Sequence, residues 1–321
     1  MKTIWNVSLC ALITLSGISS CNQSTVVSEA INPSGARISQ AQDNLPTVQQ
    51  IRQSFDLGYD TTTIVPKMDV FKTEVRNVWT GTASIPVQIY YPNNKKNLPI
   101  IYYMHGGAFV WSPGIDMHIS RLLCNRTESV VVSIDYRLAP EHPFPATVNE
   151  CFAVWNWVDQ QAENLHGNRK KVILVGDSGG GNYLGAILYK QKSNKLKPLA
   201  CVYVNPAPDL RPTAPGIAPY ELMRSWYLNN ANPNDPLASP LLTPSFKHYP
   251  QSLILVSEID GLKAQGVMLA DKLKNAGVDT QLFELKGLDH LGFYWCNTNP
   301  IAKPAIDKVV SYINTVKTKK D

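Results

Sequence analysis

Charged residues are scarce in this 321-residue chain, and they do not gather on any one segment. Only 17% of the residues are charged, and the formal net charge is +5. Proteins that bind nucleic acids usually concentrate lysine and arginine in a patch or stripe, which is missing here apart from the C-terminal KTKKD. Internal repeats and low-complexity tracts are also absent. With 44% hydrophobic residues, the composition indicates an ordinary globular protein without a nucleic-acid partner.

Cysteines are few, and their spacing matches no metal-binding pattern. Cys151 and Cys201 lie in apolar runs, so we expect both to be buried as small hydrophobic residues. The sequence does not show whether these two or the remaining Cys124 and Cys296 form disulfides. We therefore predict neither a metal site nor a cofactor.

No apolar run is long enough to form a stable transmembrane helix. The apolar segment that follows Lys2, IWNVSLCALITLSGI, instead fits a secretory signal. It ends in Ile18-Ser19-Ser20-Cys21, which resembles a bacterial lipobox, where the cysteine is acylated and becomes the first residue. We predict residues 1–21 as a signal peptide with Cys21 as the lipidation site. A plain signal peptide with a chance cysteine is the alternative. In a Gram-negative bacterium, the residue after the cysteine is Asn22 and not the aspartate that favours retention in the inner membrane, so the periplasmic face of the outer membrane would be the default location. Without the lipid anchor, the protein would be periplasmic or secreted.

The rest of the chain divides into a short N-terminal part and one large domain. Residues 22–68 are predicted to be a tether with a short helix near 46–60. Two alternating runs, at 70–79 and 85–91, predict a β-hairpin. Residues 69–321 are predicted to form the main domain. Within it, the proline-rich region 206–250 is too long for a simple loop and is predicted to be an inserted cap with its own helix near 220–228.

Short apolar bursts alternate with helical patterns through the main domain. The bursts lie at 100–104, 130–134, 172–175, 199–204, 253–256 and 281–285. The helical stretches lie at 146–161, 182–192, 261–276 and 304–316. This alternation predicts an α/β fold, in which a mostly parallel sheet is covered by helices on both faces.

A serine surrounded by glycines stands at one of the predicted strand-to-helix junctions. Gly176-Asp177-Ser178-Gly179-Gly180 matches G-x-S-x-G, a sharp turn that holds the serine hydroxyl exposed at its tip. The free N–H groups of the following helix would face any negative charge that develops there. The segment lacks the G-K-[ST] ending of a phosphate-binding loop and the G-x-G-x-x-G of a dinucleotide site. A glycine-rich turn with a capping serine is the alternative.

A nucleophilic serine needs a histidine base and an acid that orients it. Among the six histidines, His290 follows the last predicted strand. Enzymes with a nucleophilic serine in a G-x-S-x-G turn carry their histidine base at this place in the chain. Asp260, after the preceding strand, is the favoured acid. Glu258 is the competitor, because alternate residues of an extended segment point the same way.

The segment Met104-His105-Gly106-Gly107-Ala108-Phe109 follows a predicted strand and is a candidate oxyanion loop. The N–H groups of Gly106 and Gly107 are expected to turn inward, and the N–H of Gly179 would add a third donor. Such donors stabilise the negative oxygen of a tetrahedral intermediate. We interpret His105 as a residue that shapes the loop.

These motifs together resemble the hormone-sensitive-lipase-like family of carboxylesterases, within the α/β-hydrolase fold. The matching stretches are HGGAF, DYRLAPEHPFPA, GDSGGGN, ASPLL, SEIDGL and DHLGF, which follow the family's order over about residues 75–318. The resemblance implies hydrolysis of short- to medium-chain esters, with Ser178 as nucleophile, Asp260 as acid and His290 as base. It also implies that Asp135 and Arg137 brace the oxyanion loop and the sheet.

The sequence departs from the family pattern at three places. Gly179 replaces the usual alanine, and Gly261 replaces the usual proline after the acid. An extra residue, Leu291, follows the histidine and could move its ring.

The remaining expectations concern the substrate. Aromatic residues that could line an apolar pocket are Phe109, Trp111, Tyr220, Trp226 and Phe293. The expected partner is a small-molecule ester. The alternatives are an amide or peptide hydrolase with the same residues, or a non-catalytic, lipid-anchored binding protein. The sequence does not indicate the oligomeric state.

Overall fold

The computed structural model describes residues 45–58, 67–191, 197–292 and 300–319. The chain divides into two compact units, residues 1–58 and 59–321. In the first unit, α3 (Val48–Gly58) confirms the predicted helix. It begins with a capping box, in which the Thr47 N–H donates to Gln50 Oε1 at 2.8 Å while Thr47 Oγ1 accepts from the Gln50 N–H at 3.3 Å. The predicted signal peptide and Cys21 lie outside the described residues and stay predictions.

The second unit is built on one eight-stranded sheet with the order β1-β2-β4-β3-β5-β6-β7-β8. The strands are β1 (Lys72–Trp79), β2 (Ser84–Tyr91), β3 (Leu98–Met104), β4 (Val130–Ile134), β5 (Gly167–Asp177), β6 (Ala200–Val204), β7 (Ser252–Ser257) and β8 (Thr280–Leu285). Strand β2 pairs antiparallel with β1 and β4, and the other pairs are parallel. The structure therefore confirms the predicted hairpin and the mostly parallel sheet.

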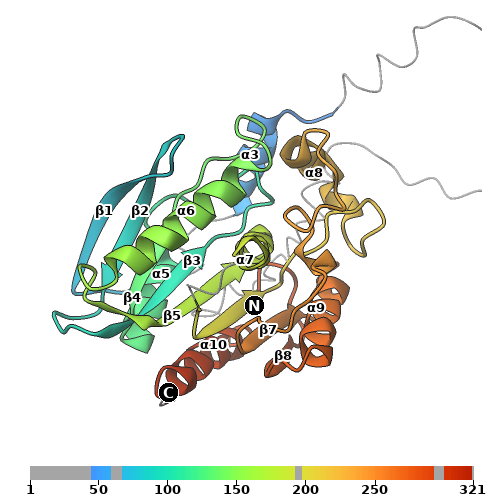
Figure 1. Cartoon of the computed structure of the whole chain (residues 1–321). Coiled ribbons are helices and arrows are strands. Elements are labelled where there is room, and N and C mark those ends of the chain that lie inside the picture. The colour runs from blue at the N-terminus through green and yellow to red at the C-terminus, as the bar shows by residue number, and fades with distance from the viewer. Residues whose placement is uncertain (1–44, 59–66, 192–196, 293–299, 320–321) are drawn as a thin grey trace, which may run out of the picture. The chain divides into compact units, whose positions relative to one another are not determined.

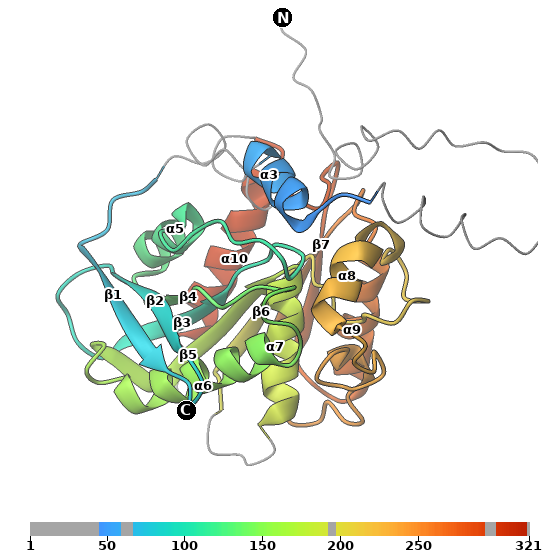
Figure 2. The ribbon, with the colours of Figure 1, turned by 90° about the horizontal axis from the view of Figure 1, so that it is seen from above.

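Helices cover both faces of this sheet (Figures 1 and 2). The helices are α5 (His118–Thr127), α6 (Ala146–Gln161), α7 (Gly179–Lys190), α9 (Lys263–Asn275) and α10 (Lys303–Val316). Side chains of α5 and α10 pack into one hydrophobic core with β3–β7. Figure 2 shows α6, α7 and α9 on the opposite face. All five residues of β4 and of β6 are buried, as expected for strands covered on both sides.

Helix α5 is not among the helices that the sequence pattern predicts. Its ten residues, HISRLLCNRT, mix polar and apolar positions, and three of its seven buried residues are the polar His118, Ser120 and Thr127. Met117 precedes the helix without a capping side-chain hydrogen bond. Both usual signals, an apolar stripe and a capping residue, are therefore weak.

The predicted insertion lies between β6 and β7 and contains one α-helix, α8 (Glu221–Leu228), within the expected range. Two short 3₁₀ helices flank it, η1 (Ala218–Tyr220) and η2 (Pro240–Leu242). Asn182 of α7 holds the insertion at two points. Its side-chain amide donates to the carbonyls of Ala207 and Ala238, both at 2.9 Å.

The described cysteines Cys124, Cys151 and Cys201 are buried, as expected for the last two, and all three are free thiols. Burial raises the pKa of all three thiols, that of Cys124 to about 12. Cys296 lies outside the described residues. In the part of the chain that the structure describes, no helix combines the length and the apolar character needed to cross a membrane.

Candidate active site

Ser178 stands at the turn between β5 and α7, with a positive φ of 50°. Few residues other than glycine adopt this conformation, which marks a turn under constraint. Two glycines allow it. A Cβ at Gly176 would lie 2.5 Å from the Gly180 carbonyl oxygen, and one at Gly180 would lie 2.0 Å from that of Met104. The turn therefore needs glycine at both positions, as the G-x-S-x-G pattern indicates.

The three residues predicted to form a triad lie in one hydrogen-bonded series. His290 Nε2 is 2.8 Å from Ser178 Oγ, and His290 Nδ1 is 2.7 Å from Asp260 Oδ2. The Asp260 side chain is 1% exposed, and its Oδ1 accepts a hydrogen bond from the Leu262 N–H at 2.9 Å. The extra residue Leu291 therefore does not displace the histidine ring from the serine.

The environment of His290 favours its protonated form. Burial alone lowers the pKa of a histidine, because the charged ring loses its hydration. Here the negative charge of Asp260 and its hydrogen bond to Nδ1 outweigh burial, so the pKa of His290 is raised above its ordinary value. The arrangement thus stabilises the cation that forms when the ring takes a proton from the serine.

Glu258, the competing acid, faces away from the histidine. Its carboxylate is exposed and accepts a hydrogen bond from the Gly287 N–H at 2.8 Å, and it forms an ion pair with Lys286 at 3.1 Å. Glu258 therefore stabilises the start of the loop that carries His290, at Lys286 and Gly287. The structure brings Asp260, and not Glu258, to the ring.

Asn205, which no sequence motif marks, holds the histidine loop from its position directly after β6. Its amide Nδ2 donates to the His290 carbonyl at 2.9 Å and to Ser257 Oγ at 3.0 Å. Its Oδ1 accepts from the Ser257 N–H at 2.8 Å. Asn205 is 3% exposed, so these bonds are shielded from water. Its position directly after a strand was the only signal in the sequence.

The prediction that Gly106 offers its N–H to the oxyanion hole is wrong. That N–H donates to Asp177 Oδ2 at 3.0 Å, while the Tyr103 hydroxyl donates to Asp177 Oδ1 at 2.6 Å. Gly106 is needed for space instead, since a Cβ there would lie 3.0 Å from that of Ser178. Asp177, also missed from the sequence, anchors the loop beside the serine.

The next residues of the loop have unpaired N–H groups. The N–H groups of Gly107, Ala108 and Gly179 donate no hydrogen bond to any of the described residues. Gly107 has a φ of 125° and Ala108 one of 49°, so the loop turns sharply here. The backbone N of Phe109 lies 3.6 Å from where a Gly179 Cβ would stand, which places the loop against the start of α7.

His105 shapes this loop from within, as predicted. Its ring is buried and stacks on Tyr136 with 4.1 Å between centroids. Its Nδ1 lies 3.0 Å from the Tyr136 hydroxyl. Burial lowers the pKa of His105, which keeps the ring neutral.

Arg137 braces helix α6 and not the oxyanion loop, which corrects one implication of the family resemblance. Its Nε donates to Glu150 Oε1 at 2.6 Å, and its backbone N–H donates to Glu150 Oε2 at 3.0 Å. Asp135 accepts a hydrogen bond from Ser112 Oγ at 3.1 Å.

Two of the predicted substrate-binding residues are almost fully buried. Phe109 is 5% exposed and stacks on Tyr227 with 4.2 Å between ring centroids. Trp111 is 8% exposed, and its backbone N–H donates to the Gly107 carbonyl at 3.0 Å. Both residues belong to the packed structure of the oxyanion loop, and their contact with substrate stays a prediction.

The other aromatic candidates come from the inserted region and the C-terminal loop. Tyr220 lies beside the catalytic candidates, with its ring centroid 6.1 Å from that of His290. Trp226 is half-buried on α8. Phe293 lies outside the described residues.

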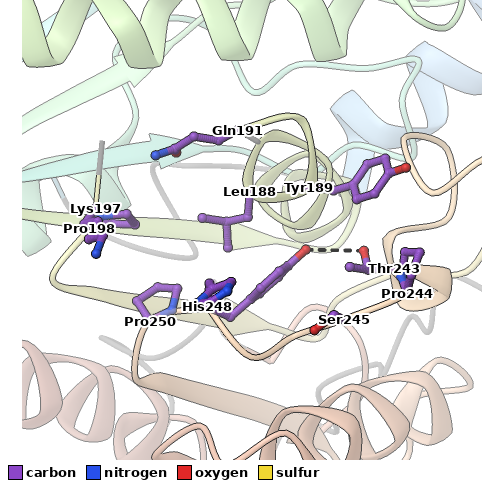
Figure 3. A pocket seen from close by; sticks show the side chains of 11 residues that line it. Leu188, Tyr189, Gln191, Lys197, Pro198, Thr243, Pro244, Ser245, His248 and Pro250 are labelled. Atoms are coloured by element: carbon purple, nitrogen blue, oxygen red, sulfur yellow. Dashed lines mark hydrogen bonds between the residues drawn. The ribbon is translucent and has the colours of Figure 1, made fainter. Parts of the chain in front are cut away.

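A separate pocket of about 500 Å³ lies at the far end of α7 (Figure 3). It is lined by Leu188, Tyr189 and Gln191, by Lys197 and Pro198, and by Thr243, Pro244, Ser245, His248, Tyr249 and Pro250. None of the triad or loop residues borders it, so it is not part of the candidate active site.

Known proteins resemble this chain over the region that carries the site. Residues 101–294 match the model of the alpha/beta hydrolase fold family. An arylesterase of Saccharolobus solfataricus is 32% identical over 70% of this chain and 78% of its own. Carboxylesterase NlhH of Mycobacterium tuberculosis is 32% identical over 66% and 72%. The structure of EstE1, a carboxylesterase cloned from a metagenomic library, superposes with a TM-score of 0.78 at 28% identity, covering 85% of this chain and 99% of EstE1. The chain therefore belongs to the α/β-hydrolase fold family, as the resemblance of its motifs implies.

Proposed function

We propose that this protein is a serine carboxylesterase that hydrolyses short- to medium-chain carboxylic esters. The observation that carries the proposal is the hydrogen-bonded series from Ser178 Oγ through His290 to Asp260 at a strand-turn-helix junction. The names of the relatives, arylesterase and carboxylesterase, support the same class of substrate.

In this mechanism the hydroxyl of Ser178 attacks the ester carbonyl carbon while His290 Nε2 accepts its proton. Asp260 holds the ring in the tautomer with the hydrogen on Nδ1, and it stabilises the cation that results. The tetrahedral intermediate then expels the alcohol, which takes the proton from Nε2. A water molecule repeats both steps on the acyl-enzyme, releasing the acid and restoring the serine.

The negative oxygen of each intermediate needs donors already in place. We assign these to the N–H groups of Gly107, Ala108 and Gly179, because the N–H of Gly106 is bonded to Asp177. Loss of one such donor typically lowers the rate about 10²–10³-fold. The three groups have no other partner among the described residues, so they are free to bind an oxyanion without rearrangement.

The test of this function is a substrate panel combined with a covalent probe. We expect the purified protein to hydrolyse p-nitrophenyl esters, with acetate to octanoate preferred over palmitate, and a fluorophosphonate to modify Ser178. Matched p-nitroanilides should react far more slowly. Faster hydrolysis of the anilides would favour an amide hydrolase. A folded protein with neither turnover nor labelling would favour a binding protein and contradict the proposal.

Asn205→Ala is expected to lower kcat by about 10–10²-fold with little change in KM. The substitution removes the hydrogen bond to the His290 carbonyl, so the loop and its imidazole ring can shift. A displacement of about 1 Å in a reacting group can lower the rate about 10²-fold. Steady-state kinetics with p-nitrophenyl butyrate measure the effect. Asn156→Ala is the control, because that amide binds only the Phe152 carbonyl of its own helix. An unchanged kcat would show that Asn205 does not position the base.

A further inference from the structure

Phe109, the last residue of the HGGAF loop, has a backbone conformation that an aromatic residue does not favour. Its φ is 71°, and that of the preceding Ala108 is 49°. For a bulky side chain such a φ is rare and costs conformational free energy, so it persists only where the surroundings hold it. One support comes from the backbone, since the Phe109 carbonyl accepts a hydrogen bond from the Ala139 N–H at 3.0 Å. The side chain supplies the contacts that follow.

The ring of Phe109 packs against two buried tyrosine rings from other parts of the chain. Tyr227 of α8 stacks on it almost parallel, with 4.2 Å between centroids and 15° between the planes. Tyr183 of α7 meets it edge-on, with 5.7 Å between centroids. Both tyrosines are 0% exposed. Aromatic pairs in such geometries stabilise a structure beyond the area that they bury. The stack on Tyr227 is the closer of the two contacts.

Phe109 also touches the other side of the candidate oxyanion hole. A Cβ at Gly179 would lie 3.4 Å from Cε1 of the Phe109 ring, so the ring lies directly against the residue whose N–H we assign as one donor. The other two assigned donors, Gly107 and Ala108, directly precede Phe109 in the chain. The position of this one ring therefore affects the spacing between the donors of the loop and the donor of α7. Such donors act only when they are in place before the oxyanion forms.

Tyr227 is held in place independently of Phe109. Its carbonyl accepts a hydrogen bond from the Phe144 N–H at 2.8 Å, and the Phe144 ring meets its ring edge-on at 5.9 Å. On the same helix, Arg224 Nη1 donates to the Leu210 carbonyl at 3.1 Å, which joins α8 to the start of the insertion. The Tyr227 hydroxyl is buried and has no hydrogen-bond partner among the described residues. Because burial without a partner is unfavourable for a hydroxyl, the ring is the useful part of this side chain.

We propose that Tyr227 is a positioning residue of the esterase, which acts from the insertion through the ring of Phe109. The stack fixes the turn at Phe109, and with it the N–H groups of Gly107 and Ala108. This inference rests on the proposed function, because that function assigns these N–H groups to the oxyanion. The insertion is then part of the catalytic machinery, since one of its helices sets the geometry of the oxyanion hole.

Two substitutions at Tyr227 separate the ring from the hydroxyl. Tyr227→Leu removes the stacking ring, and we expect it to lower kcat for p-nitrophenyl butyrate about 10–10²-fold with less than about a threefold change in KM, because the donors act on the transition state. Tyr227→Phe keeps the ring, and its kcat should stay within about twofold of the parent value. A higher KM at unchanged kcat in Tyr227→Leu would assign the ring to the substrate pocket and overturn the proposal. An equal loss of kcat in both variants would also overturn it.

Phe246→Leu is the matched control, because Phe246 is also a buried ring of the insertion. It is 5% exposed, and its centroid lies 4.9 Å from that of Tyr249. Its kcat should equal that of the parent protein when each variant is assayed well below its unfolding temperature. A loss of kcat in Phe246→Leu as large as in Tyr227→Leu would show general damage and contradict a specific role. If Tyr227→Leu does not fold, Tyr227→Met takes its place, since methionine fills irregular space without a flat ring.

A double-mutant cycle tests whether Tyr227 acts through Phe109. Phe109→Leu breaks the same stack from the other side. The variant that carries both Tyr227→Leu and Phe109→Leu should therefore lose little more kcat than the worse of the two single variants. Losses that multiply would show that the two rings act independently, and they would contradict the proposed route.

Hydrogen–deuterium exchange examines the loop without any substrate. The N–H groups of Val110 and Trp111 both donate to the Gly107 carbonyl at 3.0 Å, so their exchange reports opening of the loop. We expect this exchange to be at least about fivefold faster in Tyr227→Leu than in Tyr227→Phe, while exchange in β5 stays the same. If the parent protein hydrolyses no ester, the proposed function fails, and this comparison still decides whether Tyr227 holds the loop. Equal exchange in the two variants would contradict the inference even in an active esterase.

Discussion

Ser178→Ala is expected to lower kcat for p-nitrophenyl butyrate by about 10⁶-fold, the loss found when a serine hydrolase loses its nucleophile. The substitution removes Ser178 Oγ, the one nucleophilic atom among the described residues that lies within hydrogen-bonding distance of His290 Nε2. The oxyanion donors and the base remain, but they have no nucleophile to assist. Labelling by the fluorophosphonate should be lost together with the activity.

The fold should survive this change, so the loss can be read as chemistry. A φ of 50° costs alanine and serine a similar conformational free energy, so the substitution adds no backbone strain. The hydroxyl that is lost makes one partly buried hydrogen bond, which contributes little to the free energy of unfolding. Ser225→Ala is the matched control, since its hydroxyl bonds only the Leu222 carbonyl on the surface of α8. If Ser178→Ala kept activity comparable to that of the control, the nucleophile would have to be another residue.

The sheet was predictable because its strands are short, apolar and separated by helical patterns. The predicted helix at 146–161 coincides with α6 (Ala146–Gln161), and the predicted strand at 130–134 coincides with β4. Helix α5 was missed because its buried face includes His118, Ser120 and Thr127, so local hydrophobicity does not reveal it. Burial of those side chains depends on strands and helices that only the tertiary structure brings near.

The triad was predictable from motifs and chain order, whereas its supports were not. Gly106 was assigned to the oxyanion hole because the two glycines of HGGAF look equivalent in sequence. Asp177, 71 residues away, takes the N–H of the first glycine and leaves the second free. Asn205 was missed for a similar reason, since it lies 85 residues from the histidine whose carbonyl it binds.

The extra residue after the histidine, Leu291, is accommodated by hydrogen bonds within its own loop. The Asp289 side chain accepts a hydrogen bond from the Leu291 N–H at 3.1 Å, and the Asp289 carbonyl accepts one from the Gly292 N–H at 3.2 Å. These bonds close a compact turn after His290. His290 keeps its place because Asn205 binds its backbone carbonyl and Asp260 binds Nδ1 of its ring.

Asp260→Asn is expected to lower kcat about 10⁴-fold, the effect of the same change in another serine hydrolase. The reason lies in the second oxygen of the carboxylate. Oδ1 accepts a hydrogen bond from the Leu262 N–H, so an asparagine would keep its oxygen there and turn its NH₂ group toward His290 Nδ1. The ring would then carry its hydrogen on Nε2, and it could not accept the proton of Ser178. Glu258→Gln is the matched control, because Glu258 binds Gly287 and Lys286 and not the ring.

The pH dependence distinguishes loss of the acid from general damage to the site. His290 must be neutral to act as base, so kcat/KM of the parent protein should fall as the pH drops through the raised pKa of His290. In Asp260→Asn the negative charge is gone while burial remains, so the pKa of the ring falls. The acidic limb of the profile should therefore move to lower pH, although the plateau is far lower. In Glu258→Gln the acidic limb should lie at the same pH as in the parent protein. An acidic limb that moved with Glu258→Gln and not with Asp260→Asn would show that Glu258, and not Asp260, is the acid paired with the histidine.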